Sequence, residues 1–223
     1  MTELYSKAKL PTRFGEFDIY IFREHDLEHA VLVNPWKDEA ATVRIQSKCI
    51  TGEVFGSLKC DCGDQLEIAL DIIGERGGML IYLDQEGRGI GLGNKIKAYE
   101  LQQQGFDTVD ANLMLGFSED ERDFSSAADI LEQFGVSNVK LLTNNPDKSE
   151  ALLKAGIKVE RIPIKGEVNA HNKDYLFAKQ MRMGHELDLN EIKMNHRQNI
   201  RKITKDNESG IIRKVKLGSH RGA

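Results

Sequence analysis

The chain has little cysteine, which argues against a protein stabilised by a framework of disulfides. Only three cysteines occur among 223 residues, and an odd number argues against a disulfide framework. No apolar stretch approaches the roughly 20 residues that a membrane-spanning helix needs. Residues 1–7 also lack the apolar core of a secretory signal. We therefore expect a cytoplasmic protein without membrane association.

The overall composition is that of a globular protein, but the charge is unevenly distributed. The formal net charge is −4, yet residues 193–223 carry nine Lys or Arg and two Asp or Glu. This basic segment has few large apolar residues and no aromatic residues that would stack on bases. We expect a globular domain over residues 1–190 and a basic, flexible extension over 191–223, with a nucleic-acid-binding arm as the alternative.

Segments with the patterns of strands and helices alternate along the chain. Strand patterns occupy residues 17–21, 41–45, 79–83 and 139–142. Helical spacing of apolar residues occurs at 66–73, 92–99, 124–134 and 147–155, and a glycine follows each segment. This alternation predicts an α/β fold, a layered mixed sheet flanked by helices. Ligands tend to bind at the carboxyl ends of such strands.

All three cysteines fall within fourteen positions. Cys49, Cys60 and Cys62 have the spacing C-x10-C-x-C, and three thiolates suit a borderline-soft ion such as zinc. No histidine is close in sequence; the nearest are His29 and His171. The spacing fits an open zinc site with a water as fourth ligand. Free buried cysteines, or a structural zinc closed by a distant histidine, are the alternatives.

A glycine-rich segment, residues 84–93, follows one predicted strand. Its glycines allow close approach of the backbone to a ligand, and the start of the next helix favours an anion. Arg88 can donate two hydrogen bonds to a phosphate, and Glu86 can accept one or bind a metal. A glycine-rich turn with a surface arginine explains the segment equally well.

Two other loops carry charged or polar residues. Thr143 and Lys148, at the start of a predicted helix, can bind an anion, although a simple helix-capping turn is the alternative. The charged run 119–123 is typical of a solvated surface and gains a functional meaning only if it faces the metal.

Taken together, the ordered motifs resemble GTP cyclohydrolase II, the zinc enzyme that opens the guanine ring of GTP at the entry to riboflavin synthesis. The similarity extends from about Ala8 to Leu187. The matching segments are residues 52–67, 85–88, 90–92, 94–96, 98–102, 105–112, 115–117, 120–124, 141–146 and 183–185. The resemblance implies the fold of that family, one Zn²⁺ per chain, Mg²⁺ with the triphosphate, GTP as substrate and a homodimer.

The resemblance also implies a role for individual residues. Cys49, Cys60 and Cys62 would bind zinc. The implied catalytic residues are Arg122, as nucleophile on the α-phosphorus or as a purely electrostatic group, Asp120, as proton acceptor, and Tyr99, near the reacting base. The implied GTP-binding residues are Arg44, Gln65, Glu86, Arg88, Thr108, Thr143 and Lys148.

The chain departs from the family pattern at four positions near these residues. Gln46 replaces a histidine and Glu53 replaces an aspartate. Lys48 replaces an acidic residue and Asp84 replaces an arginine, so the charge is reversed at both positions in opposite senses. We hypothesise that Lys48 and Asp84 form an ion pair; two independent surface changes are the alternative, since exposed charges vary at little cost.

Three functions fit these patterns. The first is GTP cyclohydrolase II activity for riboflavin synthesis. The second is a paralogue that opens a purine nucleotide but stops at a formylamino product or serves another pathway. The third is a non-catalytic zinc module that binds nucleotide or nucleic acid. The presence of Tyr99, Asp120 and Arg122 argues against the third, whereas the first two differ in product rather than in any residue identified above.

Overall fold

The computed structural model describes residues 1–106, 108–118, 120–164, 166 and 168–183. The predicted extension 191–223 and the predicted domain boundary at 190 lie outside these residues. Within the described part of the chain, no helix combines the length and the apolarity that crossing a bilayer requires.

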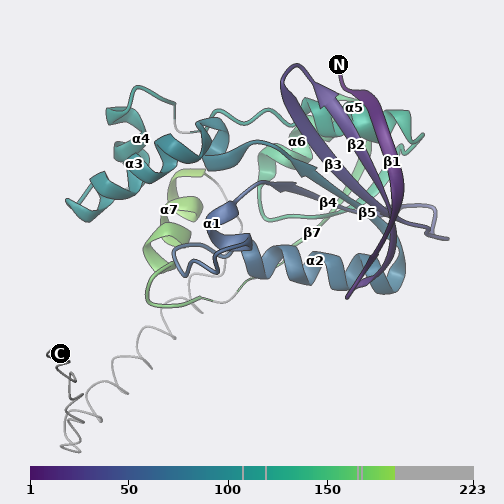
Figure 1. Ribbon diagram of the computed structural model, residues 1–223, viewed down its shortest axis with the longest axis horizontal. Coiled ribbons are helices and arrows are strands. Elements are labelled where there is room, and N and C mark those ends of the chain that lie inside the picture. Colours follow the sequence, from purple (N-terminus) through teal and green to yellow (C-terminus); the bar gives the residue numbers. More distant parts are fainter. Residues whose placement is uncertain (107, 119, 165, 167, 184–223) are drawn as a thin grey trace, which may run out of the picture. The chain divides into compact units, whose positions relative to one another are not determined.

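A seven-stranded mixed sheet organises the fold (Figure 1). The strands, in spatial order, are β1 (Glu3–Thr12), β2 (Gly15–Glu24), β3 (Leu27–Asn34), β5 (Gly78–Leu83), β4 (Ala41–Ser47), β6 (Asn138–Leu142) and β7 (Lys158–Ile162). The first three strands pair antiparallel, and β3 pairs antiparallel with β5. Strands β5, β4, β6 and β7 run parallel to one another. The predicted mixed α/β sheet is therefore confirmed.

Helices cover both faces of the sheet. Figure 1 shows α2 (Cys62–Arg76) along one face, and α5 (Ser125–Gln133) and α6 (Pro146–Lys154) on the other. In β5, Leu80 packs with Ile73 of α2, whereas Ile81 packs in the cluster that contains Leu131 of α5 and Leu152 of α6. A strand buried on both faces needs apolar residues at every position, which explains the continuous apolar run 79–83.

The parallel strands have their carboxyl ends at the same edge of the sheet, so the loops that follow them gather there. β4 leads into α1 (Ile50–Glu53), β5 into the 3₁₀ turn η1 (Glu86–Gly89), and β6 into the turn before α6. Figure 1 shows α1, α3 (Gly91–Gln103), α4 (Thr108–Met114) and α7 (Lys173–Met183) beyond this edge. The motif loops found in the sequence therefore meet in space.

Strand β1 is the outer strand of the sheet on the side away from β7, and among the described residues it pairs only with β2. Its pairing with β2 is interrupted by an irregularity between Leu4 and Ser6. Lys7, Lys9 and Pro11 of this strand are exposed.

Candidate metal and anion site

Three thiols converge between the end of β4 and the start of α2. The Sγ atoms of Cys49, Cys60 and Cys62 all lie within 4.8 Å of one another, and those of Cys49 and Cys60 are 3.7 Å apart. A tetrahedral zinc ion with Zn–S bonds of about 2.3 Å separates two sulfurs by about 3.8 Å. The Cys49–Cys60 distance matches this spacing, and the cluster of three thiols is consistent with a zinc site.

Two glycines allow the helices that carry the cysteines to approach each other. A Cβ atom on Gly52 would lie 2.8 Å from Cys60 Sγ and 3.4 Å from Cys49 Sγ. A Cβ atom on Gly63 would lie 2.7 Å from the carbonyl oxygen of Gly52. Any larger residue at either position would push the thiols apart or shift the helices.

The three thiols shift one another's pKa values. Hydrogen bonds from Cys60 and Cys62 lower the pKa of Cys49. The same contact with Cys49 raises the pKa of Cys60 to about 11. These contacts favour the thiolate form of Cys49, which is the form that binds a metal.

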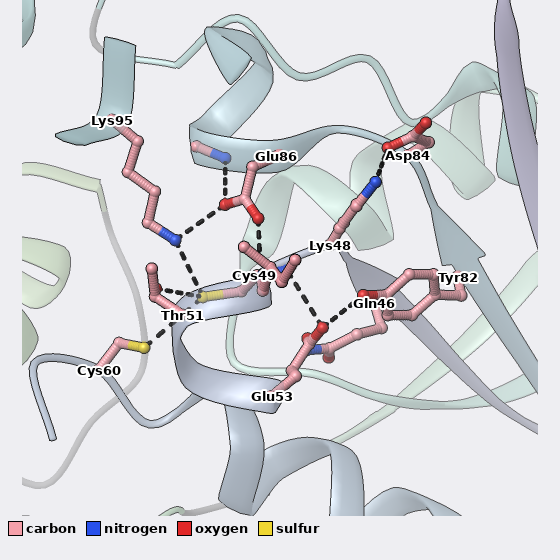
Figure 2. A network of polar contacts seen from close by, with 12 residues as sticks. Gln46, Lys48, Cys49, Thr51, Glu53, Cys60, Tyr82, Asp84, Glu86 and Lys95 are labelled. Carbon is pink, nitrogen blue, oxygen red and sulfur yellow. Dashed lines mark hydrogen bonds and ion pairs between the residues drawn. The ribbon is translucent and has the colours of Figure 1, made fainter. Parts of the chain in front are cut away.

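The backbone at Cys49 is held by the partly buried carboxylate of Glu53. Glu53 Oε2 accepts the Cys49 N–H at 3.1 Å, and the Tyr82 hydroxyl donates to the same oxygen. Gln46 Nε2 donates to Glu53 Oε1 at 2.6 Å (Figure 2). Burial raises the pKa of Glu53, and the hydrogen bonds from Tyr82 and Gln46 oppose this effect. The two departures Gln46 and Glu53 therefore contact each other.

The two charge-reversed positions also contact each other. Lys48 Nζ lies 2.9 Å from Asp84 Oδ1, and Figure 2 shows this pair beside Cys49. The hypothesis of an ion pair between them is confirmed.

A lysine that the sequence analysis did not single out also reaches the thiols. Lys95 Nζ, from α3, is 3.2 Å from Cys49 Sγ and 2.8 Å from Glu86 Oε1. Burial opposes its charge, but the hydrogen bond with Glu86 and the charge of Cys49 raise the pKa of Lys95 overall. The available signal was its position four residues before Tyr99, on the same helix face.

A cavity of about 320 Å³ opens beside the thiols. The residues that line it include all three cysteines, Lys48, Lys59, Glu86, Arg88, Lys95, Tyr99, Phe106, Asn112, Arg122, His171 and Tyr175. The ring of Tyr99 forms part of the wall, with Lys59 Nζ 4.4 Å from the ring centroid. Burial raises the pKa of Tyr99, so its hydroxyl stays protonated and can donate a hydrogen bond.

A second, smaller cavity of about 60 Å³ is strongly basic. Its charged lining residues are Arg44, Arg88, Arg122, Lys148 and Lys179; among the described residues that line it, none is acidic. Arg88, Arg122, Cys62 and Tyr175 line both cavities. Clustered buried cations next to the thiols can bind a polyanion.

The charged run 119–123 contributes directly to these cavities. Glu121 and Asp123 are exposed, whereas Asp120 and Arg122 point inward. Arg122 Nε donates to Asp120 Oδ1 at 2.8 Å, and a second contact joins Arg122 Nη2 to Asp120 Oδ2. Burial opposes both charges, yet this pairing lowers the pKa of Asp120 and raises that of Arg122. The reading of this run as a solvated surface therefore fails for its inward-facing residues.

A backbone contact positions this segment on the glycine-rich loop. The Glu121 N–H donates to the Arg88 carbonyl at 3.0 Å. Gly89 has φ +92°, and a Cβ atom there would lie 2.9 Å from Glu121 Cβ. The glycine is required both by its backbone conformation and by this close approach.

Arg44 and Gln65 form the buried floor of the second cavity. The Arg44 guanidinium donates to Gln65 Oε1 at 2.7 Å, to the Leu142 carbonyl at 2.8 Å and to Gln46. Burial lowers the pKa of Arg44 to about 10. Its hydrogen-bonding capacity is thus largely used by the protein itself.

The turn after β6 caps helix α6 and carries Thr143 and Lys148, which line the second cavity. Asn145 accepts the Asp147 N–H at 2.9 Å and caps α6, and Thr143 Oγ1 accepts the Asn145 N–H at 3.0 Å. Lys148 Nζ donates to the Ile45 carbonyl at 2.8 Å. Thr108 begins α4, and its side chain lies outside the described part of the structure.

Helix α7 supplies two further residues that the sequence analysis missed. Lys179 Nζ lies 3.1 Å from Asp61 Oδ1 and 4.5 Å from the Tyr175 ring centroid. The Arg88 guanidinium carbon lies 5.6 Å from the same ring centroid. The only signal in the sequence was the four-residue spacing of Tyr175 and Lys179.

Comparisons with known proteins agree with this arrangement. The sequence profile of the GTP cyclohydrolase II family matches residues 3–163. The GTP cyclohydrolase-2 of Helicobacter pylori (strain Shi470) is 50% identical over 187 residues, which cover 82% of this chain and 97% of that protein. The riboflavin biosynthesis protein RibBA of Staphylococcus saprophyticus is 50% identical over 183 residues, covering 81% of this chain and 47% of that protein. The chain thus spans about half the length of RibBA relatives.

Among solved structures, a two-domain 3,4-dihydroxy-2-butanone 4-phosphate synthase from A. baumannii is 20% identical. The match covers 74% of this chain and 40% of that one, with a TM-score of 0.42. A likeness this low carries no argument on fold or function.

Proposed function

Because the chain belongs to the GTP cyclohydrolase II family, we propose that it is a zinc-dependent hydrolase of GTP. It would open the imidazole ring, release formate and pyrophosphate, and supply the first pyrimidine of riboflavin biosynthesis. The observation that carries this proposal is the adjacency of the three thiols and the basic cavity. The residues that would hold a metal for ring hydrolysis and a cluster of cations that would bind the phosphates lie within one site.

Cys49, Cys60 and Cys62 would hold the zinc ion, and the distances between their sulfur atoms support this. A zinc ion with three thiolate ligands and an open position supplies an activated water near neutral pH. Among the described residues, no other group of three His, Cys, Asp or Glu side chains has metal-binding spacing. We therefore propose that Mg²⁺ enters with the triphosphate and is bound mainly by phosphate oxygens and water.

The basic cavity would receive the phosphates. Arg88 and Lys148 would bind them directly, and Lys179 would add charge from α7. Thr143 would contribute its hydroxyl from the turn before α6. Arg44 and Gln65 would support the cavity from its buried floor, and Thr108 is kept as a proposed GTP contact on the family resemblance alone.

Arg122 would act as a fixed positive charge rather than as a nucleophile. A nucleophilic guanidinium has to lose a proton, and arginine resists this even in water. The contact with Asp120 raises the pKa of Arg122 further. We propose that Arg122 stabilises the charge that develops at the α-phosphate, while ionised Asp120 orients it and can accept a proton.

Tyr99 would bind the guanine base beside the metal. Its protonated hydroxyl, in the wall of the larger cavity, can donate a hydrogen bond to a ring atom or to a water. The cavity of about 320 Å³ is large enough for a purine base.

The proposal includes a homodimer in the cytoplasm. Free thiols suit a reducing compartment. Large apolar side chains are exposed on α3, on α4 and between them: Leu92, Ile96, Phe106, Leu113 and Met114. Exposed apolar side chains in such number favour a protein interface. Light scattering of the wild type and of a variant with Leu113→Glu and Met114→Glu tests this; a wild-type monomer contradicts it.

The function is tested by incubating the purified protein with GTP, Zn²⁺ and Mg²⁺ and assaying formate, pyrophosphate and the pyrimidine product together. We expect all three products in the wild type. Pyrophosphate without formate would favour the paralogue that stops at a formylamino product.

The matched variants for this assay are Cys60→Ser and Leu58→Ala, since Leu58 is exposed in the same loop. We expect Cys60→Ser to lose both zinc and ring opening, and Leu58→Ala to keep both. Full formate release by metal-free Cys60→Ser protein would refute the zinc mechanism.

A further inference from the structure

We propose that Lys95 is a positioning residue of the metal site, which holds the sulfur of Cys49 in place for the metal by donating a hydrogen bond to it. Glu86 would in turn hold Lys95. This inference rests on the proposed zinc site, and it gives a function to a side chain that lies in the matching segment 94–96 but was assigned no role there.

Hydrogen bonds of Lys95 and Glu86 connect the sulfur of Cys49 to the backbone of the next residue, Ile50. Lys95 Nζ lies between Cys49 Sγ, at 3.2 Å, and Glu86 Oε1, at 2.8 Å (Figure 2). The other carboxylate oxygen, Glu86 Oε2, accepts the Ile50 N–H at 2.7 Å. Glu86 therefore links the lysine to the backbone next to Cys49, so the sulfur and the main chain are held from the same side.

The ion pair of Lys95 and Glu86 is largely shielded from water and therefore differs from a surface ion pair. The side chains of Lys95 and Glu86 are only 12% and 7% exposed. A solvated ion pair leaves both groups free to move and contributes little. A buried ammonium must keep its hydrogen bonds, because losing one would leave a charged donor unsatisfied. Lys95 is thus fixed with one of its protons directed at the sulfur.

Charge balance gives the contact a second effect. Three thiolates and one divalent cation carry a net charge of −1, and the carboxylate of Glu86 adds another negative charge beside them. The ammonium of Lys95 offsets this excess at hydrogen-bond distance. Outer partners that orient a metal ligand commonly change metal affinity about 10- to 100-fold when they are removed.

The test compares zinc affinity of the full-length protein, measured by competition with a chromophoric chelator, in three lysine variants. Lys95→Met removes the hydrogen bond and the charge, and we expect zinc affinity to fall about 10- to 100-fold. Lys95→Arg keeps a charged donor and should retain most of the affinity. Lys97→Met removes the same charge from an exposed position on the same helix and should bind zinc like the wild type.

A spectroscopic measurement separates the hydrogen bond from a general effect on folding. In the Co²⁺-loaded protein, loss of a hydrogen bond to the thiolate makes the sulfur a stronger electron donor. We expect the thiolate-to-cobalt charge-transfer bands to move to lower energy in Lys95→Met and to stay in place in Lys97→Met. If Lys95→Met does not fold, Lys95→Leu, which also lacks both the charge and a hydrogen-bond donor, carries both measurements.

Wild-type zinc affinity together with an unshifted cobalt spectrum in Lys95→Met would overturn the role of Lys95 and leave the zinc site intact. If Cys60→Ser binds zinc as tightly as the wild type, the zinc site itself is wrong and the proposed function fails with it. The two failures are therefore distinguishable.

Discussion

The ammonium of Lys48 holds the carboxylate of Asp84 and so joins the loop after β4 to the loop after β5. Both residues depart from the family pattern, and in opposite senses of charge. Gln46 and Glu53, which also depart from it, contact each other in the same region. The four departures near Cys49 therefore form two pairs of residues in direct contact. This arrangement is expected when a change at one position compensates a change at the other.

Reversing one charge of the first pair should impair the enzyme, and reversing both should restore it. Lys48→Glu places two carboxylates together beside the cavity. Because the two side chains are 38% and 32% exposed, we expect a coupling of at most about 1 kcal/mol, or roughly a fivefold change in kcat/KM. The double variant with Lys48→Glu and Asp84→Arg should recover most of this loss.

A matched control is the ion pair of Lys140 and Asp38, whose charged atoms are 3.1 Å apart and which does not line either cavity. Lys140→Glu should leave kcat/KM unchanged. If the double variant is no better than Lys48→Glu alone, the compensation does not affect catalysis.

Gly52→Ala should damage the metal site. The added methyl group would lie 2.8 Å from Cys60 Sγ, so either the thiol or α1 has to move. We expect zinc content to fall well below one ion per chain, measured by atomic emission after dialysis. Gly93→Ala is the control, because nothing lies within 4 Å of its Cβ position; equal zinc content in both variants would show that the cysteine cluster tolerates the methyl group.

Arg122→Ala should slow pyrophosphate release by about 100-fold, the usual effect of removing one donor aimed at developing charge. Zinc should remain bound, because Arg122 contacts Asp120 rather than the thiols. Arg122→Lys keeps the charge but loses the two-point contact, so we expect intermediate activity. Equal inactivity of both variants would instead favour a nucleophilic arginine.

Phosphate binding should be accompanied by proton uptake at Lys148. Burial and the nearby charges of Arg44 and Arg122 hold the pKa of Lys148 well below its ordinary value. A bound polyphosphate favours the ammonium and raises this pKa, so the complex binds more protons than the free protein at any pH between the two values. Calorimetry with tripolyphosphate in buffers of different ionisation enthalpy measures this uptake.

The controls for proton uptake lie on the same helix. Lys148→Met should abolish the dependence of the binding enthalpy on the buffer, whereas Lys154→Met, at an exposed position, should preserve it. The absence of any dependence on buffer in the wild type would mean that Lys148 does not change its protonation on binding.

Features encoded over short stretches were predictable from the sequence. The three cysteines lie close in sequence, and strand β5 is a continuous apolar run because both of its faces are buried. Strand β1 has no such run, since most of its side chains are exposed. For the same reason its residues gave no strand pattern.

Features that depend on tertiary packing were not predictable. Lys179 reaches Asp61 across 118 positions of sequence, and an isolated lysine in a polar helix is typical of a solvated surface. Arg44 was expected to bind GTP. Its buried guanidinium donates a hydrogen bond to Gln65, a contact that the spacing of residues in the sequence does not reveal. The sequence identifies which residue types gather at the site, while the packing decides which of them face the cavity.

The irregular, lysine-bearing edge strand β1 has a consequence for behaviour at high concentration. An open edge can recruit a strand from another molecule and seed aggregation. In β1 the irregularity between Leu4 and Ser6 breaks the regular ladder, Pro11 lacks an N–H donor, and Lys7 and Lys9 would be brought against a second copy. These features disfavour strand-to-strand pairing through this edge and so oppose the growth of fibres from the sheet.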